Sequence, residues 1–345
     1  MADSLTLTSS IANLRLESFL LTQESLASAR ERLTDNGVLV LYNYYRQLWL
    51  IEKLAGMVGR TFGQDPLVST YGGWGRAAVI MAGPRLSRLP PGFFGMYKEN
   101  TSATGDSELR VIGEGYYPVP SRTPATDDWP FLYLREQSFP SIYITALAMV
   151  GALSLAGILT IAPRSTLRRF DWHMFFLGVA FALLEVKSLI VFALLFGSTW
   201  MVNALVFFAI LGSVLLAVLV NSRFKIQRIG IFYLLLFGLL ALNLVLPPQA
   251  LLFDNPTLRY LVASSLAFAP VFLANVIFSN SFRDSEVADV AFASNLLGIM
   301  VGGMLEYFSM LLGYHLLLLP VMAFYGLALL LRNRTSVAAL EPSAT

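Results

Sequence analysis

The sequence contains no cysteine, and only 13% of its 345 residues are charged. The chain can therefore form neither a disulfide nor a thiolate metal site. Soluble globular domains are about 25% charged and roughly 45–50% apolar, whereas this chain is 56% apolar and has a mean hydropathy of +0.64. The net charge of +2 gives no indication of nucleic-acid binding. The composition excludes an ordinary soluble enzyme and indicates an integral membrane protein whose main partner is the lipid bilayer.

The few charges are concentrated at the start of the chain. Residues 1–138 hold 27 charged residues, whereas the longer remainder holds 19. This shift predicts a transmembrane helical domain at 139–334, followed by a short tail at 335–345. The fold class that we expect is mainly α: a polytopic membrane helix bundle, preceded by a partial α/β Rossmann-like domain of the methyltransferase type.

Seven apolar stretches are long enough to cross a hydrocarbon core of about 30 Å, which takes ~20 residues of helix. The fourth and seventh are the shortest. The predicted spans lie near 141–162, 172–196, 200–220, 229–247, 258–279, 287–312 and 314–331. With seven spans, nine Lys and Arg residues gather in loops on one side and three on the other. The positive-inside rule then places the C-terminus in the cytoplasm and residues 1–138 outside.

Residues 1–85 have the pattern of a partial α/β domain. Helices are expected at 24–33 and 47–62, and strands at 38–42, 67–71 and 77–82, the last two around a glycine-rich turn at 72–75. The continuous apolar run at 38–42 predicts a strand buried on both faces. Residues 86–138 are rich in Pro, Gly, Ser and Thr, which predicts a loop-rich connector.

The front half of a nucleotide-binding fold is missing from this pattern. Such a fold needs a glycine-rich turn after its first strand and an acidic residue about 20 positions later. No residue pattern before Val38 supplies either. We therefore expect no cofactor to bind to this chain alone.

Several stretches, taken together, resemble bacterial membrane-bound spermidine-synthase-like proteins, in which an S-adenosylmethionine-type Rossmann domain is joined to transmembrane helices. The most specific are Thr126-Asp127-Asp128-Trp129-Pro130 and Glu185-Val186-Lys187-Ser188. The others are found at 16–24, 35–40, 195–200 and the Glu306-Tyr307 segment. The resemblance implies a multi-pass protein of the bacterial inner membrane with aminopropyl- or methyl-transferase-like chemistry.

The resemblance also has implications for cofactor and catalysis. In the complete family the cofactor is S-adenosylmethionine or its decarboxylated form. Asp3 matches an acidic position whose Asp acts in soluble spermidine synthases as base on the attacking amine. The expectation is a chain that is not catalytically competent alone. It is either a fragment or the partner of a separate polypeptide that carries the cofactor-binding half.

Polar side chains inside the predicted spans form another candidate site, because an ionisable group in lipid is costly and is a functional hypothesis by default. Gly298 and Gly302 are four residues apart, which favours close helix packing. They share a helix face with Asn295 and Glu306. The predicted cluster comprises Glu185, Lys187, Ser188, Asn203, Asn275, Asn295 and Glu306. It has two interpretations. One is a site for a polyamine or another small cation, or a proton path; the other is a buried ion pair and amide bonds that fix helix register.

Two further functions therefore stand beside the transferase: a polyamine or small-cation transporter-like bundle, and a non-catalytic membrane scaffold. The Asp127-Asp128 pair is a candidate acidic lid for a cationic substrate; the alternative is a turn with Trp129 as an interfacial aromatic anchor. His173 and His315 lie in separate places and predict no metal site.

Overall fold

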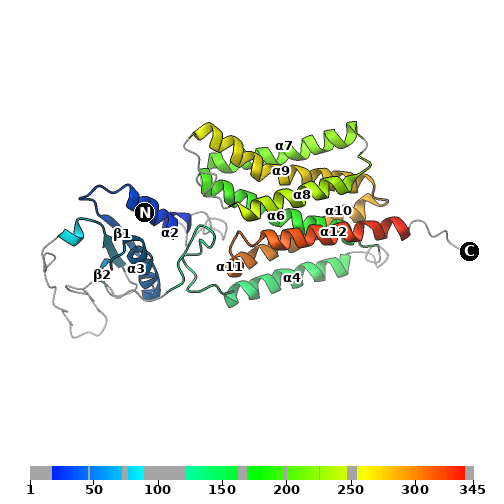
Figure 1. Cartoon of the computed structure of the whole chain (residues 1–345). Helices are drawn as coiled ribbons and strands as arrows, with labels where there is room; N and C mark the ends of the chain where they lie inside the picture. The colour runs from blue at the N-terminus through cyan, green and yellow to red at the C-terminus, as the bar shows by residue number, and fades with distance from the viewer. Residues whose placement is uncertain are drawn as a thin grey trace, which may run out of the picture. The chain divides into compact units, whose positions relative to one another are not determined.

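The computed structural model describes residues 18–45, 47–71, 77–88, 122–161, 169–196, 200–224, 226–246 and 255–338 (Figure 1). Asp3, the turn at 72–75 and residues 89–121 of the predicted connector lie outside these described residues. The chain divides into two compact units, Met1–Ser138 and Phe139–Thr345.

The first unit contains a small sheet and two α-helices. In chain order its elements are η1 (Ser18–Leu21), α2 (Gln23–Glu31), β1 (Leu39–Tyr44), α3 (Leu48–Phe62), β2 (Leu67–Tyr71), β3 (Ala77–Ala82) and η2 (Leu86–Arg88). The strand order is β1-β3-β2, and both pairs are antiparallel. Ile80 at the centre of β3 lies opposite Leu41 and Val68. Because β1 and β2 both run against β3, they are parallel to each other, and α3 is the crossover between them.

Helix α3 covers one face of this sheet. Its buried side chains Ile51, Leu54 and Val58 belong to the same core as Ile80 of β3. The expectation that the first strand is buried on both faces was wrong, because its burial alternates along β1 and Tyr42 is 75% exposed. The physical reason is that only one face of the strand meets α3. The helix ends where Gly63 adopts a positive φ of 69°, a conformation that glycine tolerates.

The second unit is helical. Its elements are α4 (Ser141–Ile161), α6 (Trp172–Phe196), α7 (Trp200–Arg223), α8 (Ile229–Val245), α9 (Pro256–Arg283), α10 (Ala288–Leu305), η4 (Glu306–Phe308), α11 (Ser309–Leu312) and α12 (Leu318–Ala338). Five segments of the described chain are long and apolar enough to cross a membrane: those in α4, α6, α7, α9 and α10 with its continuation to Leu312. Helix α8 and the apolar part of α12, Leu318–Arg332, are shorter.

Helix α6 lies at the centre of this bundle, against α9, α10 and α12, while α7 and α8 pack on α9 (Figure 1). The core that they share includes Leu183 of α6, Val271 of α9 and Tyr325 of α12, all buried. In α4, none of the most apolar stretch is buried inside the chain. Ring contacts connect α4 with η4: Tyr143 lies 5.6 Å from Tyr307 between ring centroids.

The sixth predicted span is not one continuous helix. The α-helix stops at Leu305, and the 3₁₀ turn η4 begins at Glu306. The short helix α11 then ends at Leu312 and is capped by Gly313, which has a φ of 79°. Asn295, Gly298 and Gly302 are nevertheless all buried on α10, and Glu306 is only 8% exposed. Despite the break, the predicted stripe of Asn295, Gly298, Gly302 and Glu306 is buried inside the unit.

Candidate functional site

In the first unit, the end of the Thr-Asp-Asp-Trp-Pro stretch and the residues after it contact a buried lysine. Lys53 of α3 is 0% exposed, and its Nζ donates to the carbonyls of Leu134 at 2.7 Å and Phe131 at 3.2 Å. The same nitrogen lies 4.5 Å from the centroid of the Trp129 ring. Burial lowers the pKa of Lys53 to about 7. The residue thus connects α3 to a segment about 80 positions later in the chain.

We call residues 122–134 the strap, because they lie across α2 and α3. Asp127 accepts a hydrogen bond from the Thr22 hydroxyl at 2.7 Å, and its backbone N–H donates to Glu24 at 2.9 Å. Burial raises the pKa of Glu24, although the N–H of Asp127 opposes that shift. Arg122 forms an ion pair with Glu52 of α3, 2.6 Å between Nη2 and Oε2. The end of the predicted connector is therefore part of this unit's packed structure.

Trp129 of the strap is 2% exposed, which differs from the interfacial anchor expected as one alternative. Its backbone N–H donates to the Thr126 hydroxyl at 3.0 Å, which closes a local turn. The carboxylate of Asp127 accepts the hydrogen bond from Thr22, whereas the neighbouring Asp128 is exposed. In this geometry the strap holds α2 and α3 together.

In the second unit, glycines bring α6 and α10 into backbone contact. A Cβ atom on Gly302 would lie 2.6 Å from the carbonyl oxygen of Val179, and one on Gly298 would overlap the carbonyl of Phe175. Gly178 of α6 similarly faces the Asn295 backbone. The Asn295 amide donates to the carbonyl of Met174 at 3.1 Å. This close approach is the geometry that small residues permit between membrane helices.

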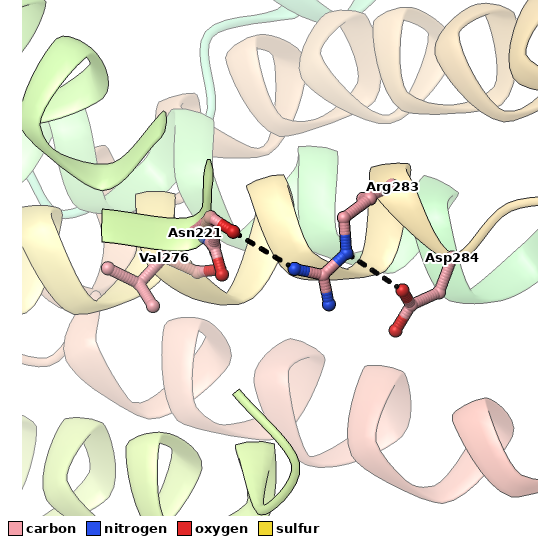
Figure 2. A network of polar contacts seen from close by, with 4 residues as sticks. All are labelled: Asn221, Val276, Arg283 and Asp284. Atoms are coloured by element: carbon pink, nitrogen blue, oxygen red, sulfur yellow. Dashed lines mark hydrogen bonds and ion pairs between the residues drawn. The ribbon is translucent and has the colours of Figure 1, made fainter. Parts of the chain in front are cut away.

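The other buried amides serve different interfaces. Asn275 of α9 donates to the Ser213 hydroxyl of α7 at 2.9 Å. About two turns further along α7, Asn221 donates to the Val276 carbonyl at 3.0 Å, and Arg283 donates to the Asn221 carbonyl at 3.1 Å (Figure 2). These bonds join α7 to α9. The predicted amides are therefore spread over separate helix pairs.

A second polar group gathers where Pro270 interrupts α9. Pro270 has no N–H to donate to the carbonyl of Leu266, four residues earlier, and Asn243 of α8 donates to that oxygen at 3.2 Å. Ser188 of α6 donates to the carbonyl of the next residue, Ala267, at 3.4 Å. Lys187, 6% exposed, lines an adjoining space of about 10 Å³. That space suits about one water molecule.

The two predicted intramembrane carboxylates are in different settings. Glu185 is half-buried on α6, and Glu306 is buried in the 3₁₀ turn after α10. Asn203 lies on α7, and its side chain is outside the described part of the structure.

Sequence reasoning missed a polar pocket of about 780 Å³ at one end of the bundle. Its wall combines the start of α6, the α9–α10 junction and one residue of α12. Charged residues of both signs line it: Arg169, Asp171, Asp284, Glu286 and Arg332. Their positions on the predicted cytoplasmic side were the available signal, but the loops at 169–171 and 284–286 are more than a hundred residues apart in sequence, and Arg332 lies on a third segment.

His173 and Ser281 form one side of this pocket. The Nδ1 of His173 lies 2.7 Å from the carbonyl of Ala328, and its Nε2 lies 2.9 Å from the Ser281 hydroxyl. Because a carbonyl only accepts, Nδ1 carries the proton in the neutral ring and Nε2 accepts from Ser281. His173 thus connects α6 with α9 and α12. Among the described residues, no group of three or more His, Asp or Glu is placed to hold a metal ion.

No protein-family model, curated protein or solved structure matches this chain.

Proposed function

We propose that the chain is the membrane-anchored portion of a spermidine-synthase-like transferase, acting with a cofactor-binding half supplied by other residues or another polypeptide. The observation that carries the proposal is the crossover from β1 through α3 to the parallel strand β2. Parallel strands joined by a helix are the unit from which Rossmann-like sheets are built. The specific strap sequence packs on the same α3.

The position of β1 in the sheet supports the proposal of a separate cofactor-binding half. Within the described sheet β1 has one neighbour, β3, so its other edge is available for a further strand. Val40, Tyr42 and Tyr44 on one face of β1 are 45%, 75% and 48% exposed. A further strand could pair with this other edge of β1, and a helix packed over the exposed face would bury that apolar surface, as in a sheet with helices on both faces.

The sequence between β1 and α3 offers no glycine-rich turn for a cofactor. Its residues are Tyr45-Arg46-Gln47, and Tyr45 is buried, so close backbone approach by a cofactor is not favoured there. Aminopropyl or methyl transfer would therefore depend on the other half, which would hold the cofactor. Our proposal for this chain is anchoring and completion of the sheet.

Seven spans in the bacterial inner membrane, with a cytoplasmic C-terminus, are part of the proposal. Helix α8 has 17 residues, about 25 Å at 1.5 Å per residue, slightly less than the hydrocarbon core. Helix α12 continues past Arg332 to Ala338, and arginine side chains near a helix end can extend to the interface. The alternative of a polyamine path through the bundle gains less support, since the space beside Lys187 is about 10 Å³ and a cationic side chain lines it.

The test is purification of the tagged chain from its native membranes in mild detergent, followed by isothermal titration with S-adenosylmethionine and its decarboxylated form. We expect binding only when a Rossmann-type half is present, and no binding by the isolated chain. Tight binding by the isolated chain would overturn the proposal. So would a native preparation that contains no such half and binds neither compound.

A further inference from the structure

We propose that the polar pocket at the α6, α9 and α10 ends binds a small zwitterion that carries a phosphate and an ammonium group a few bonds apart. This inference is independent of the transferase proposal. It rests on residues of the helical unit alone: a volume of about 780 Å³, within the range of roughly 300–1,000 Å³ typical of small-molecule sites, and donors and carboxylates that line the same space.

A buried amide points to a ligand. Asn280 lines the pocket and is 4% exposed, and its Nδ2 has no hydrogen-bond partner among the described residues. A buried donor left without an acceptor costs about 1–3 kcal/mol. Native proteins retain few such groups, and a bound acceptor is a common explanation. A phosphate oxygen in the pocket would supply it after a rotation of the amide, because Nδ2 itself is closed off from solvent.

The start of α10 favours the same anionic group. Val287, at the N-cap position, lines the pocket and offers no side-chain acceptor to the first-turn amides. Those N–H groups lack partners within the helix and carry its positive dipole end, so they attract phosphate. Arg169 and Arg332 also line the pocket, and guanidinium groups suit phosphate geometry. The α10 start, Asn280 and the two arginines therefore make one anion-binding side.

Carboxylates in the wall call for a positive charge on the ligand as well. Glu286 and Asp284 lie at the rim, and Asp284 already pairs with Arg283 at 3.1 Å. Asp171 accepts the N–H of Met174 at 3.0 Å, so part of its carboxylate is used to cap α6. Glu286 is the carboxylate best placed to receive an ammonium group. A simple phosphate would meet this negative charge without compensation, whereas a zwitterion satisfies both signs.

The chemistry has two sources, a phosphatidylethanolamine headgroup and a soluble phosphorylated amine, and one experiment separates them. The full chain is reconstituted in phosphatidylglycerol nanodiscs and titrated with O-phosphoethanolamine, inorganic phosphate and ethanolamine. We expect O-phosphoethanolamine to bind at least about tenfold more tightly than either half-molecule. If phosphatidylethanolamine added to the nanodiscs weakens this binding about tenfold, the lipid headgroup occupies the site; unchanged affinity identifies a soluble ligand.

Two variants test the residues. Asn280→Leu removes a donor without a partner and should keep the thermal midpoint, while lowering affinity for O-phosphoethanolamine about tenfold. Arg169→Gln, at the exposed rim, should weaken binding similarly without affecting folding. Arg223→Gln is the matched control, because Arg223 is an exposed arginine at the end of α7 that does not line the pocket. Equal affinity for all three probes, no binding, or unchanged binding in both variants would overturn the proposal.

Discussion

Gly298 of α10 lies against the backbone carbonyl of Phe175 on α6, so closely that any Cβ atom at this position would overlap the oxygen. The same seam continues at Gly302, which faces Val179 and Ala182. Between membrane helices, packing of this kind replaces the hydrophobic driving force, because lipid tails are as apolar as the side chains.

We therefore predict that Gly298→Ala destabilises the helical unit by about 1–3 kcal/mol, since the backbones must separate to admit a methyl group. Thermal unfolding in detergent should show a lower midpoint. Gly303→Ala is the control, because nothing lies within 4 Å of a Cβ atom there. An equal effect of the two substitutions would contradict the assignment of Gly298 to a tight interface.

The bond from Asn243 to Leu266 gives a prediction about Pro270. Asn243→Leu should cost roughly 0.5–1.5 kcal/mol, as interhelical hydrogen bonds in membranes do. In a Pro270→Ala background the cost should be smaller, because residue 270 then supplies the N–H that the Leu266 carbonyl lacks. A double-mutant cycle on unfolding free energies measures the difference. The same cost in both backgrounds would show that Asn243 does not compensate for the proline.

The buried Lys53 should make stability depend on pH. Its pKa is about 7 in the folded protein and about 10.4 when unfolded, so between these values the unfolded chain binds more protons. Stability therefore rises with pH from about 7 to about 10. Lys53→Met removes this dependence, so the variant's midpoint relative to the original chain should fall as pH rises through this window.

Thermal unfolding of the full chain at several pH values measures that difference. Glu52→Gln is a suitable control, because Glu52 lies on the same helix as Lys53 and the substitution alters only its ion pair with Arg122. A difference between Lys53→Met and the original chain that is constant with pH would contradict the prediction.

Membrane orientation can be tested without background labelling, because the chain has no cysteine. Ser222→Cys and Thr257→Cys introduce thiols at exposed positions near opposite predicted sides. In spheroplasts, a membrane-impermeant maleimide should label Thr257→Cys and leave Ser222→Cys unlabelled. The reverse pattern would place the C-terminus outside, and labelling of both would contradict the alternation of spans between these residues.

The positions of most elements follow from the amino-acid sequence alone. Apolar length located the helices of the second unit, and local periodicity located β2 and β3 at Leu67–Tyr71 and Ala77–Ala82. The glycine spacing at Gly298 and Gly302 identified a helix face by geometry alone. These features depend on neighbouring residues, whose preferences for helix or strand are largely local.

Tertiary structure decided which distant groups meet. The pocket combines Arg169, Asn280 and Arg332, whose separation in sequence leaves no local pattern. Lys53 finds its acceptors in the strap, and β1 is buried on the face that α3 covers. Such pairings follow from how whole elements pack and from the need of each buried polar group for a partner, which residue periodicity does not encode.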